Sequence, residues 1–493
     1  MMDMSQFYTT ADHFSIIPAV MLALFACAIL LFDFLVFPDP RQRKYLLIFL
    51  VLAELFTGFE LYRQSVWLAA NSVPQLSGFA GTVTVDGFAI FFNWIFLIAA
   101  VIVALASYKY LEVAGEHHGE YYALMLFAQC GMYFLATGTD LITLFIGLEL
   151  MALCFYVMVG FLRTDRRSNE AALKYLILGA FSSGFLVYGF SLMYGMAGST
   201  KLSMIASAIQ QRPPWDPMVF LALTTTSVGL LFKISAVPFH MWAPDAYEGA
   251  PTTVTAYLSV GSTAASIAFL LRIFLGPLAS ARDVWEPLLS LIAVLTLTVG
   301  NLAAINQTNI KRLLAYSSIS HAGYMLLGLI AGNDTGINGI AVYIMVYAFM
   351  NLGALLVVVA MRRANIIGED IDDMAGLVHK NPWYAFLMLI FLLSLAGIPP
   401  TAGFLGKYYI FLALIQTKHY ALAVFATLYV AVAIYYYFKI VRSMFNRDAD
   451  EKAPALAASF GLRFALGLTG VATLGIGLYP EPFLRFAQTS LFR

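Results

Sequence analysis

Long apolar segments separated by short polar loops run along almost the whole chain. A helix needs about 20 apolar residues to cross the hydrocarbon core of a bilayer, and the pattern predicts about fourteen such helices. We expect them near residues 14–37, 45–69, 87–111, 121–138, 140–162, 170–197, 217–239, 251–275, 285–306, 313–331, 337–361, 383–417, 420–445 and 460–480. The chain is therefore predicted to be an all-α integral membrane protein.

The loops between these segments carry two further signals. Residues 199–211 have the mixed pattern of a short amphipathic helix that lies at the membrane interface. Alternate loops differ in Lys and Arg content by about a factor of two, and the basic side of a membrane protein faces the cytoplasm. We therefore expect both termini on the non-cytoplasmic side. The first apolar run is too long for a signal peptide, so we read it as a first span.

Prolines interrupt the seventh and the twelfth segments. Pro238 follows Lys233 by five residues, and Pro399 and Pro400 lie in the middle of 383–417. Proline removes a backbone donor, and broken helices at membrane depth occur only where protein or a watery cavity satisfies the backbone. Two such breaks in corresponding positions are typical of transporters built from internal repeats.

The spacing of the breaks predicts a division of the chain. It gives an N-terminal three-helix segment (1–120), a first five-helix repeat (121–275, helices 4–8), a second, inverted repeat (285–445, helices 9–13) and a C-terminal helix 14 (446–493). The lysine precedes the proline in the first break and follows it in the second, as we would expect of an inverted repeat.

Composition narrows the class of protein. The 493 residues are 61% hydrophobic and 11% charged, so no large soluble domain fits. A formal net charge of +0 gives no support to a nucleic-acid partner. The three cysteines form no CxxC pair, and the chain has neither a dinucleotide-binding GxGxxG nor a Walker loop. We expect no metal and no cofactor on this chain, and an energy source held elsewhere.

Three charged side chains lie deep in apolar segments: Glu149, Lys233 and Lys407. A charge at bilayer depth costs a few kcal/mol or more, so these residues point to a channel or pump for a small cation, foremost the proton. Two unit charges about 4 Å apart attract by ~4 kcal/mol at an effective dielectric near 20, enough to drive a proton against a membrane potential. Glu149 would stabilise charged Lys233 if their helices touch. The alternative is a static buried ion pair that fixes helix register.

For other polar residues in apolar segments, the sequence allows either a functional or a structural role. His321 has Ser317, Ser318, Ser320 and Tyr324 around it in sequence, so it is either a proton relay or a hydrogen-bonded core residue. His240 follows the first break and could guide protons or cap a helix. Glu54 and Glu60 fall on different faces of the second segment. We expect Asp33 and Arg272, near segment ends, to snorkel or to pair.

Two motifs resemble a known family. Residues 232–251 (FKISAVPFHMWAPDAYEGAP) and 309–324 (NIKRLLAYSSISHAGY) resemble the antiporter-like membrane subunits of respiratory complex I, and the resemblance runs the full length. The YEGAPT variant looks like the subunit N (ND2) family. Lys407 is where subunit M would carry a glutamate, and we see no long lateral helix of the kind that subunit L carries.

The resemblance implies roles for individual residues. Glu149 would be the fifth-helix glutamate paired with Lys233, Lys407 the lysine toward the outer exit, and His321 part of the hydrated axis between them. Pro238, His240, Tyr324, Pro399 and Pro400 would support the breaks or the relay. The family often has a lysine in the eighth helix, where an alignment anchored on residues 258–263 and Arg272 places Thr263. The central relay would then rest on water, on the hydroxyls of Thr263 and Tyr257, or on His321.

The resemblance also implies a function. The chain would be a proton-translocating membrane-arm subunit of a bacterial NADH:quinone oxidoreductase in the cell inner membrane, driven by quinone reduction in partner subunits. FMN, iron–sulfur clusters and quinone would serve the complex without binding here. Its partners would be a neighbouring antiporter-like subunit and small membrane subunits. The alternatives are an Mrp-type cation/proton antiporter subunit, or a scaffold subunit that only seals the membrane arm.

Overall fold

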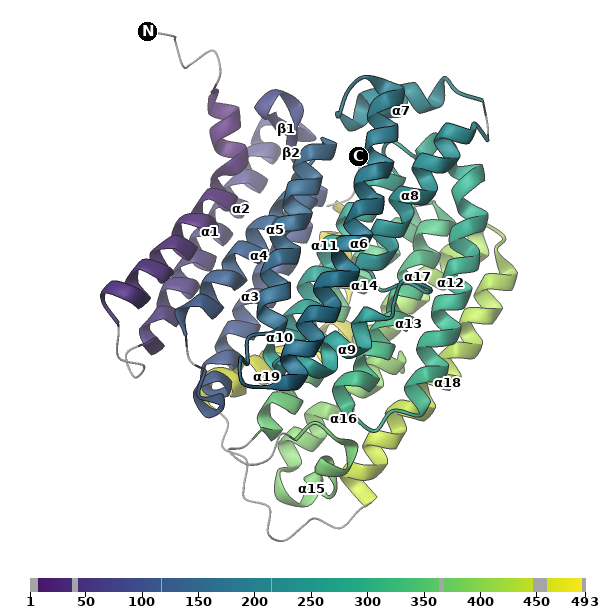
Figure 1. The fold of residues 1–493 in the computed structure, drawn as a ribbon. Helices are drawn as coiled ribbons and strands as arrows, with labels where there is room; N and C mark the ends of the chain where they lie inside the picture. The colour runs from purple at the N-terminus through teal and green to yellow at the C-terminus, as the bar shows by residue number, and fades with distance from the viewer. Residues whose placement is uncertain are drawn as a thin grey trace.

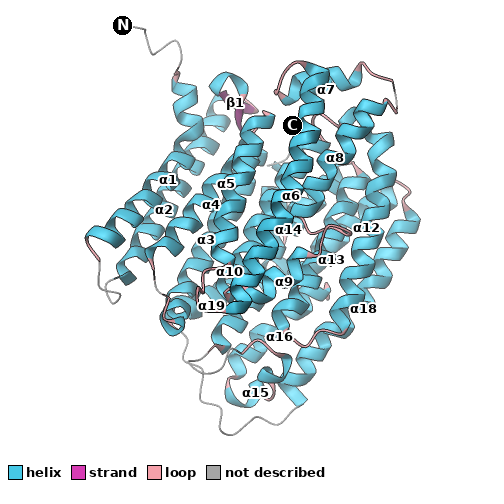
Figure 2. Ribbon diagram, in the orientation of Figure 1, coloured by secondary structure: helices cyan, strands magenta, loops and turns pink. Residues whose placement is uncertain are grey.

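The computed structural model of the protein describes residues 8–37, 43–116, 118–213, 215–362, 368–446 and 459–489. Long helices run alongside one another and form a single bundle (Figure 1). Helix is the dominant structure throughout the described residues, with one small two-stranded sheet at an end of the bundle (Figure 2). The predicted all-α membrane fold is confirmed.

The N-terminal part contributes three helices, of which the first two form one edge of the bundle and the third is mostly buried (Figure 1). They are α1 (Thr10–Leu35), α2 (Leu46–Asn71) and α3 (Gly87–Ala114). Between α2 and α3, strands β1 (Gln75–Gly78) and β2 (Val83–Asp86) pair as an antiparallel hairpin. This hairpin was not predicted, because we expected only a polar loop there. The short 3-10 segments η2 (Arg43–Tyr45) and η3 (Phe79–Gly81) complete this part.

The next group of helices contains the first break. Its members are α4 (Gly119–Thr137), α5 (Leu141–Val159), α6 (Arg166–Ala197), α8 (Pro217–Lys233), α9 (Trp242–Gly249), α10 (Thr252–Tyr257), the π-helical turn η4 (Leu258–Ser262) and α11 (Thr263–Phe274). The predicted seventh segment, 217–239, contains α8 and the break after it, and α9 follows beyond the end of that segment. The predicted amphipathic helix is present as α7 (Leu202–Gln210), at one end of the bundle.

The last group contains the second break. Its members are η5 (Ala279–Ala281), α12 (Arg282–Ile305), α13 (Ile310–Ala331), α14 (Asp334–Met361), η6 (Ile371–Met374), α15 (Leu377–Lys380), α16 (Pro382–Ala396), α17 (Ala402–Gln416), α18 (Tyr420–Asn446), α19 (Phe460–Leu478) and α20 (Glu481–Thr489). Helices α16 and α17 are the halves of the broken twelfth segment. Helix α18 forms the edge of the bundle opposite α1 (Figure 1).

Each predicted apolar segment coincides with one helix, with a continuous run of helical turns, or with a broken pair. Within the described residues, ten helices are long and apolar enough to span a membrane, and three shorter apolar helices (α8, α16 and α17) are halves of the two breaks. The division into inverted repeats at 121–275 and 285–445 stays a prediction.

Burial separates the central helices from the outer ones. Nearly every residue of α11, α13 and α14 is buried, whereas α1, α6 and α18 expose many large apolar side chains, such as Phe34, Phe181 and Tyr435. Exposed apolar helix faces are what lipid-facing helices require. Polar groups on α11, α13 and α14 therefore face protein.

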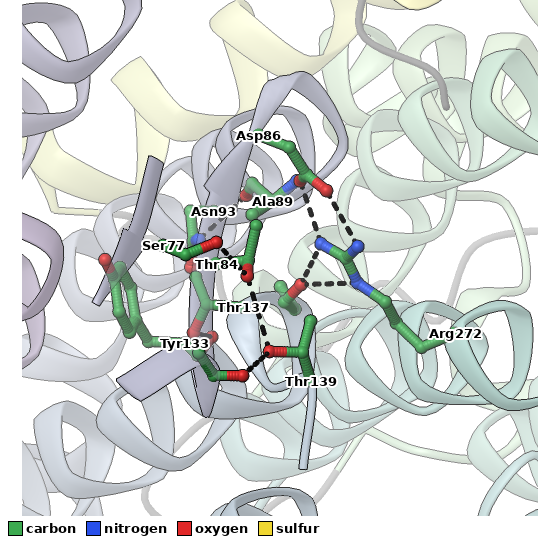
Figure 3. A network of polar contacts seen from close by, with 11 residues as sticks. Ser77, Thr84, Asp86, Ala89, Asn93, Tyr133, Thr137, Thr139 and Arg272 are labelled. Carbon is green, nitrogen blue, oxygen red and sulfur yellow. Dashed lines mark hydrogen bonds and ion pairs between the residues drawn. The ribbon is translucent and has the colours of Figure 1, made fainter. Parts of the chain in front are cut away.

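The Arg272 guanidinium joins three parts of the bundle (Figure 3). From α11 it binds both carboxylate oxygens of Asp86 at 2.7 and 2.8 Å, and it donates to the carbonyl of Ala136 at the end of α4. The Asp86 carboxylate also caps α3 by accepting from the amide of Ala89. Asp33 is paired with Arg43 at 2.9 Å. The prediction that Arg272 and Asp33 snorkel or pair is confirmed, as pairing.

Candidate functional site

The first break places Lys233 at the last residue of α8. The chain then unwinds through Ser235, whose φ of 58° is left-handed, and through a cis Val237–Pro238 bond. The indole of Trp242 donates to the carbonyl of Phe232 at 2.9 Å and so satisfies one freed helix carbonyl. A helix C-terminus carries partial negative charge, so the end of α8 favours the ammonium of Lys233.

The Lys233 ammonium contacts a hydroxyl and not a carboxylate. Its Nζ is buried and donates to the Tyr156 hydroxyl at 3.5 Å, and it lies 5.7 Å from the centre of the same ring. Glu149, two turns before Tyr156 on α5, accepts a hydrogen bond from Ser183 on α6 at 2.5 Å. As far as the chain is described, Glu149 and Lys233 form no direct ion pair. The contact considered from the sequence is thus absent in this state, although both groups flank α6.

Small residues on α6 make this arrangement possible. A Cβ at Gly179 would lie 2.0 Å from the Tyr156 hydroxyl, so only glycine leaves room for that side chain. Ser183, one turn further on, holds Glu149. Helix α6 thus positions both Tyr156 and Glu149 relative to Lys233.

The centre of the bundle holds Thr263, at the start of α11 after the π-helical turn. The Tyr247 hydroxyl from α9 interacts with the side chains of Thr263 and Ser318. Tyr347 on α14 donates to the Ser318 hydroxyl at 2.9 Å. Tyr257 instead donates to the carbonyl of Met125 on α4 at 3.2 Å. The hydroxyl brought to Thr263 is therefore that of Tyr247, which the sequence did not single out.

His321 lies in a cage of tyrosines. Its Nδ1 is 2.6 Å from the Tyr343 hydroxyl, its Nε2 is 3.3 Å from the Tyr437 hydroxyl, and its ring centre is 5.2 Å from that of Tyr347. Of the serines near it in sequence, Ser317 bonds Tyr437 and Ser320 faces Asn301 of α12. The predicted polar surroundings are present, but other helices supply the groups that touch the imidazole.

Lys407 is held by the backbone at the second break. Its Nζ donates to the carbonyls of Leu395 and Ala396, at 3.1 and 2.9 Å, which close the C-terminal end of α16. Gly397, with φ of 85°, precedes the cis Pro399–Pro400 bond, and a Cβ there would lie 2.8 Å from the lysine Cδ. No carboxylate pairs with Lys407 among the residues that the structure describes.

Tyr324 connects Lys407 to His321. The Lys407 ammonium lies 4.9 Å from the centre of the Tyr324 ring, which stacks on Tyr343 at 6.3 Å. Tyr343 in turn bonds His321, while the Tyr324 hydroxyl donates to the carbonyl of Ala426. Lys407 and His321 are therefore linked by one buried, stacked pair of tyrosines, Tyr324 and Tyr343.

One buried ion pair was missed from the sequence. Lys311 bonds Glu369 at 2.7 Å and the carbonyl of Ala250 at 2.8 Å, and Thr252 donates to the same carboxylate. Lys311 lies just before the segment expected at 313–331, so the apolar pattern did not mark it as buried. Arg312 binds Asp245 and Glu248 of α9 at 2.8 and 2.9 Å, so these two carboxylates tie α9 to α13. His240 is half-buried beside the break, and within the described chain its Nδ1 has no hydrogen-bond partner.

The described residues hold no group of three or more His, Cys, Asp or Glu side chains arranged as a metal site. Cys130 donates to the carbonyl of Ala19, Cys154 is buried in α5, and Cys27 is exposed on α1. The cysteines therefore do not form a site that fits an iron–sulfur cluster.

The fold and the site together define a class of protein. The chain is a bundle of apolar helices in which two helices are broken, each break holds a buried lysine, and buried hydroxyl and imidazole groups lie between the breaks. These are the features of a polytopic membrane protein that handles a small cation. The sequence model described as "NADH:quinone oxidoreductase/Mrp antiporter, TM" matches residues 138–433, and the chain belongs to this family. It is 84% identical, over the full length of both chains, to the NADH-quinone oxidoreductase subunit N 2 of Solibacter usitatus (strain Ellin6076). The resemblance to subunit N is confirmed.

Two solved structures show the same fold. A chain of respiratory complex I from Thermus thermophilus with bound aureothin is 32% identical, with a TM-score of 0.78 over 96% of this chain and 99% of that one. A chain of the Mrp complex from Dietzia sp. DQ12-45-1b reaches a TM-score of 0.82 over 96% and 97% at 19% identity. At that identity the likeness concerns the fold alone.

Proposed function

We propose that this chain is a proton-translocating membrane-arm subunit of an NADH:quinone oxidoreductase. The observation that carries the proposal is that buried hydroxyl and imidazole groups lie beside and between the two broken-helix lysines. They are Tyr156 at Lys233, Ser318 and Tyr347 at the centre, and His321, Tyr343 and Tyr324 toward Lys407. Its relatives' names support the assignment to this enzyme complex. The chain would act as one subunit of the enzyme, and flavin, clusters and quinone would be held by partner subunits.

These buried groups offer a route in which each member both donates and accepts. Protons would pass from Lys233 and Tyr156 to the hydroxyls around Thr263 and Tyr247, and then by Ser318 and Tyr347 to His321. From there Tyr343 and Tyr324 border the way to Lys407. A hydroxyl transfers a proton by accepting one and donating another, so the route needs no cation at Thr263. This is how the chain would function without the eighth-helix lysine.

Glu149 would be the switch of the first break. In the arrangement described it is bound to Ser183 and leaves Lys233 with a neutral hydroxyl partner. Approach of Glu149 to Lys233 would stabilise the ammonium, and its retreat would release a proton. An ion pair about 4 Å apart is worth ~4 kcal/mol at an effective dielectric near 20, more than the roughly 2.3 kcal/mol that one charge costs against 100 mV. Redox work in partner subunits would drive that movement.

The chain would lie in the bacterial plasma membrane, beside a neighbouring antiporter-like subunit and small membrane subunits. The excess of Lys and Arg in one set of loops supports an orientation with both termini on the non-cytoplasmic side. An Mrp-type antiporter is the second candidate, because the family model covers both classes and an Mrp chain shares the fold. Sodium-dependent proton flux by the isolated chain in liposomes would favour that second candidate.

The substitution Lys233→Ala tests the proposed function in the intact complex. The complex should assemble and oxidise NADH, but protons moved per electron in membrane vesicles should fall clearly, because the first station is lost. Lys109→Ala is the matched control, since Lys109 is exposed and pairs with Glu112 of its own helix. An assembled Lys233→Ala complex with an undiminished proton-to-electron ratio would contradict the proposal.

A further inference from the structure

Glu54, in the middle of α2, is a buried carboxyl group that the route above does not use. It is 2% exposed, and one of its oxygens, Oε2, accepts a hydrogen bond from the Gln129 amide on α4 at 2.9 Å. The other oxygen, Oε1, is buried and has no hydrogen-bond partner among the described residues. The same holds for Oε1 of Gln129. Two acceptor atoms of one side-chain pair are thus left without a donor.

No cation balances Glu54 within the part of the chain that the structure describes. Glu60, six residues later on the same helix, differs because Arg63 binds both of its oxygens at 2.9 and 3.1 Å. Helices α1, α3 and α4 pack against α2. Their charged side chains are all near helix ends: Asp12, His13, Asp33, Lys109, Glu112 and Glu120. Segment η2 also packs against α2, and its Arg43 is paired with Asp33. The Tyr257 hydroxyl on α10 is a further titratable group near Glu54.

These contacts decide between two forms of the carboxyl group. A carboxylate would leave an unbalanced charge in an apolar bundle and the side-chain oxygen of Gln129 without a donor, which costs several kcal/mol. A carboxylic acid has one O–H donor, which the oxygen of Gln129 can accept while the Gln129 amide donates to the other carboxyl oxygen. We infer that Glu54 is a proton-binding site, occupied at rest as a carboxylic acid paired with Gln129.

A second orphan group shows how the proton could leave. The Thr57 hydroxyl, one turn further along α2, is buried and has no hydrogen-bond partner among the described residues. Residues three apart on a helix share a face, so Thr57 can donate to the carboxylate that forms when Glu54 loses its proton. The protonated Glu54 carboxyl group can thus donate to Gln129, and the deprotonated group can accept from Thr57. This reversibility distinguishes a proton site from a fixed structural hydrogen bond.

The position of Glu54 connects it to the centre of the bundle. Tyr257 donates to the carbonyl of Met125, on the same helix as Gln129, and it immediately precedes the π-helical turn that leads to Thr263. π-helical turns occur often at functional sites. Glu54 therefore supplies a titratable group near the helix that carries Thr263 in place of a lysine. Its unloading during turnover rests on the proposed function, whereas its resting protonation does not.

Infrared difference spectroscopy of the intact complex in membranes tests the site. At pH 7 the wild type should show the carbonyl stretch of a protonated carboxylic acid that Glu54→Gln lacks. The control Glu60→Gln should leave that band unchanged, because Glu60 is ion-paired. The exchange Glu54→Gln with Gln129→Glu should restore a band, since it keeps one acid and one amide. Glu54→Asp should keep the band at a shifted frequency.

Absence of the band in the wild-type minus Glu54→Gln spectrum would overturn the inference. Addition of NADH should then change the band in the wild type, and Glu54→Gln should lower the proton-to-electron ratio less than Lys233→Ala does. A carbonyl band that stays constant during turnover would contradict the claim that Glu54 releases its proton during turnover. If Lys233→Ala pumps normally while the Glu54 band is present, the proposed function fails and the proton site stands.

Discussion

The two broken helices hold their lysines in different ways. Lys233 ends α8 and has a hydroxyl partner, Tyr156, with the carboxylate of Glu149 held nearby by Ser183. Lys407 belongs to the second half of its broken helix and reaches back to two carbonyls at the end of α16. The first lysine has a side-chain environment that can change when Glu149 moves. The second has backbone acceptors, which change only if the break itself changes.

Under the proposed function, this difference would give the two breaks different tasks. An ammonium near a movable carboxylate can be stabilised or released, which suits a station where work is put in. An ammonium fixed by helix-end carbonyls keeps one set of partners, which suits a station that only receives and passes on a proton. Substitutions that touch the second break should therefore disturb structure and pumping together. Those at the first break should lower pumping with a smaller loss of structural stability.

Gly397→Ala should have the largest effect on stability. Its φ of 85° is a left-handed conformation that costs a residue with a Cβ about 1–2 kcal/mol. The new Cβ would also meet the Lys407 side chain at 2.8 Å, and this overpacking adds a further cost of about 1–3 kcal/mol. The ammonium should lose its place at the end of α16, so thermal stability and proton pumping should both fall. Gly475→Ala in α19 is the control, because nothing lies within 4 Å of its Cβ position. Equal behaviour of the two variants would argue against a fixed second break.

The positions of the helices and of both breaks were predictable from the sequence. Apolar length identifies a span, and Pro238, Pro399 and Pro400 mark where helices must end. The partners of the buried lysines were not predictable in the same way. Tyr156, Tyr247, Tyr343 and Tyr437 count as apolar in any hydrophobic pattern, and the direction of a hydroxyl depends on how each helix is rotated in the bundle.

Two other features were not predicted, the Lys311–Glu369 ion pair and the β1–β2 hairpin, because they too depend on tertiary contacts. The pairing of Lys311 with Glu369 was not predicted, because the two residues lie 58 positions apart in sequence and no local pattern indicates such a pair. The hairpin of β1 and β2 itself contains Gly78 and Gly81, and glycines in a short segment between two spans indicate a loop when read from sequence alone. Tertiary contacts decide both cases. That Thr263 stands where the resemblance implies a lysine stays a prediction, and its partner Tyr247 was not predicted from sequence.

Gly179→Ala should have an intermediate effect, confined to the first break. The added Cβ would lie 2.0 Å from the Tyr156 hydroxyl and would push it away from Lys233, and overpacking of this kind typically costs 1–3 kcal/mol. The complex should assemble with lowered thermal stability, and pumping should fall because Lys233 loses its hydroxyl partner. Gly184→Ala on the same helix has open space at its Cβ position and is the control. Normal pumping in an assembled Gly179→Ala complex would remove Tyr156 from the route.

Ser183→Ala should change stability least and is the sharpest test of the switch. The substitution removes the hydrogen bond that holds Glu149 apart from Lys233, and loss of a hydrogen bond to a charged group costs about 1.5–3 kcal/mol unless the carboxylate finds another partner. Lys233 is the partner available, so the expected net loss of stability is small. The proton-to-electron ratio should nevertheless fall, because a permanent Glu149–Lys233 pair keeps the proton bound. Ser182→Ala, which removes a buried hydroxyl without a partner among the described residues, should leave the ratio unchanged. A Ser183→Ala complex that pumps normally would mean that Glu149 is not the switch, and the two breaks would then differ in geometry but not in task.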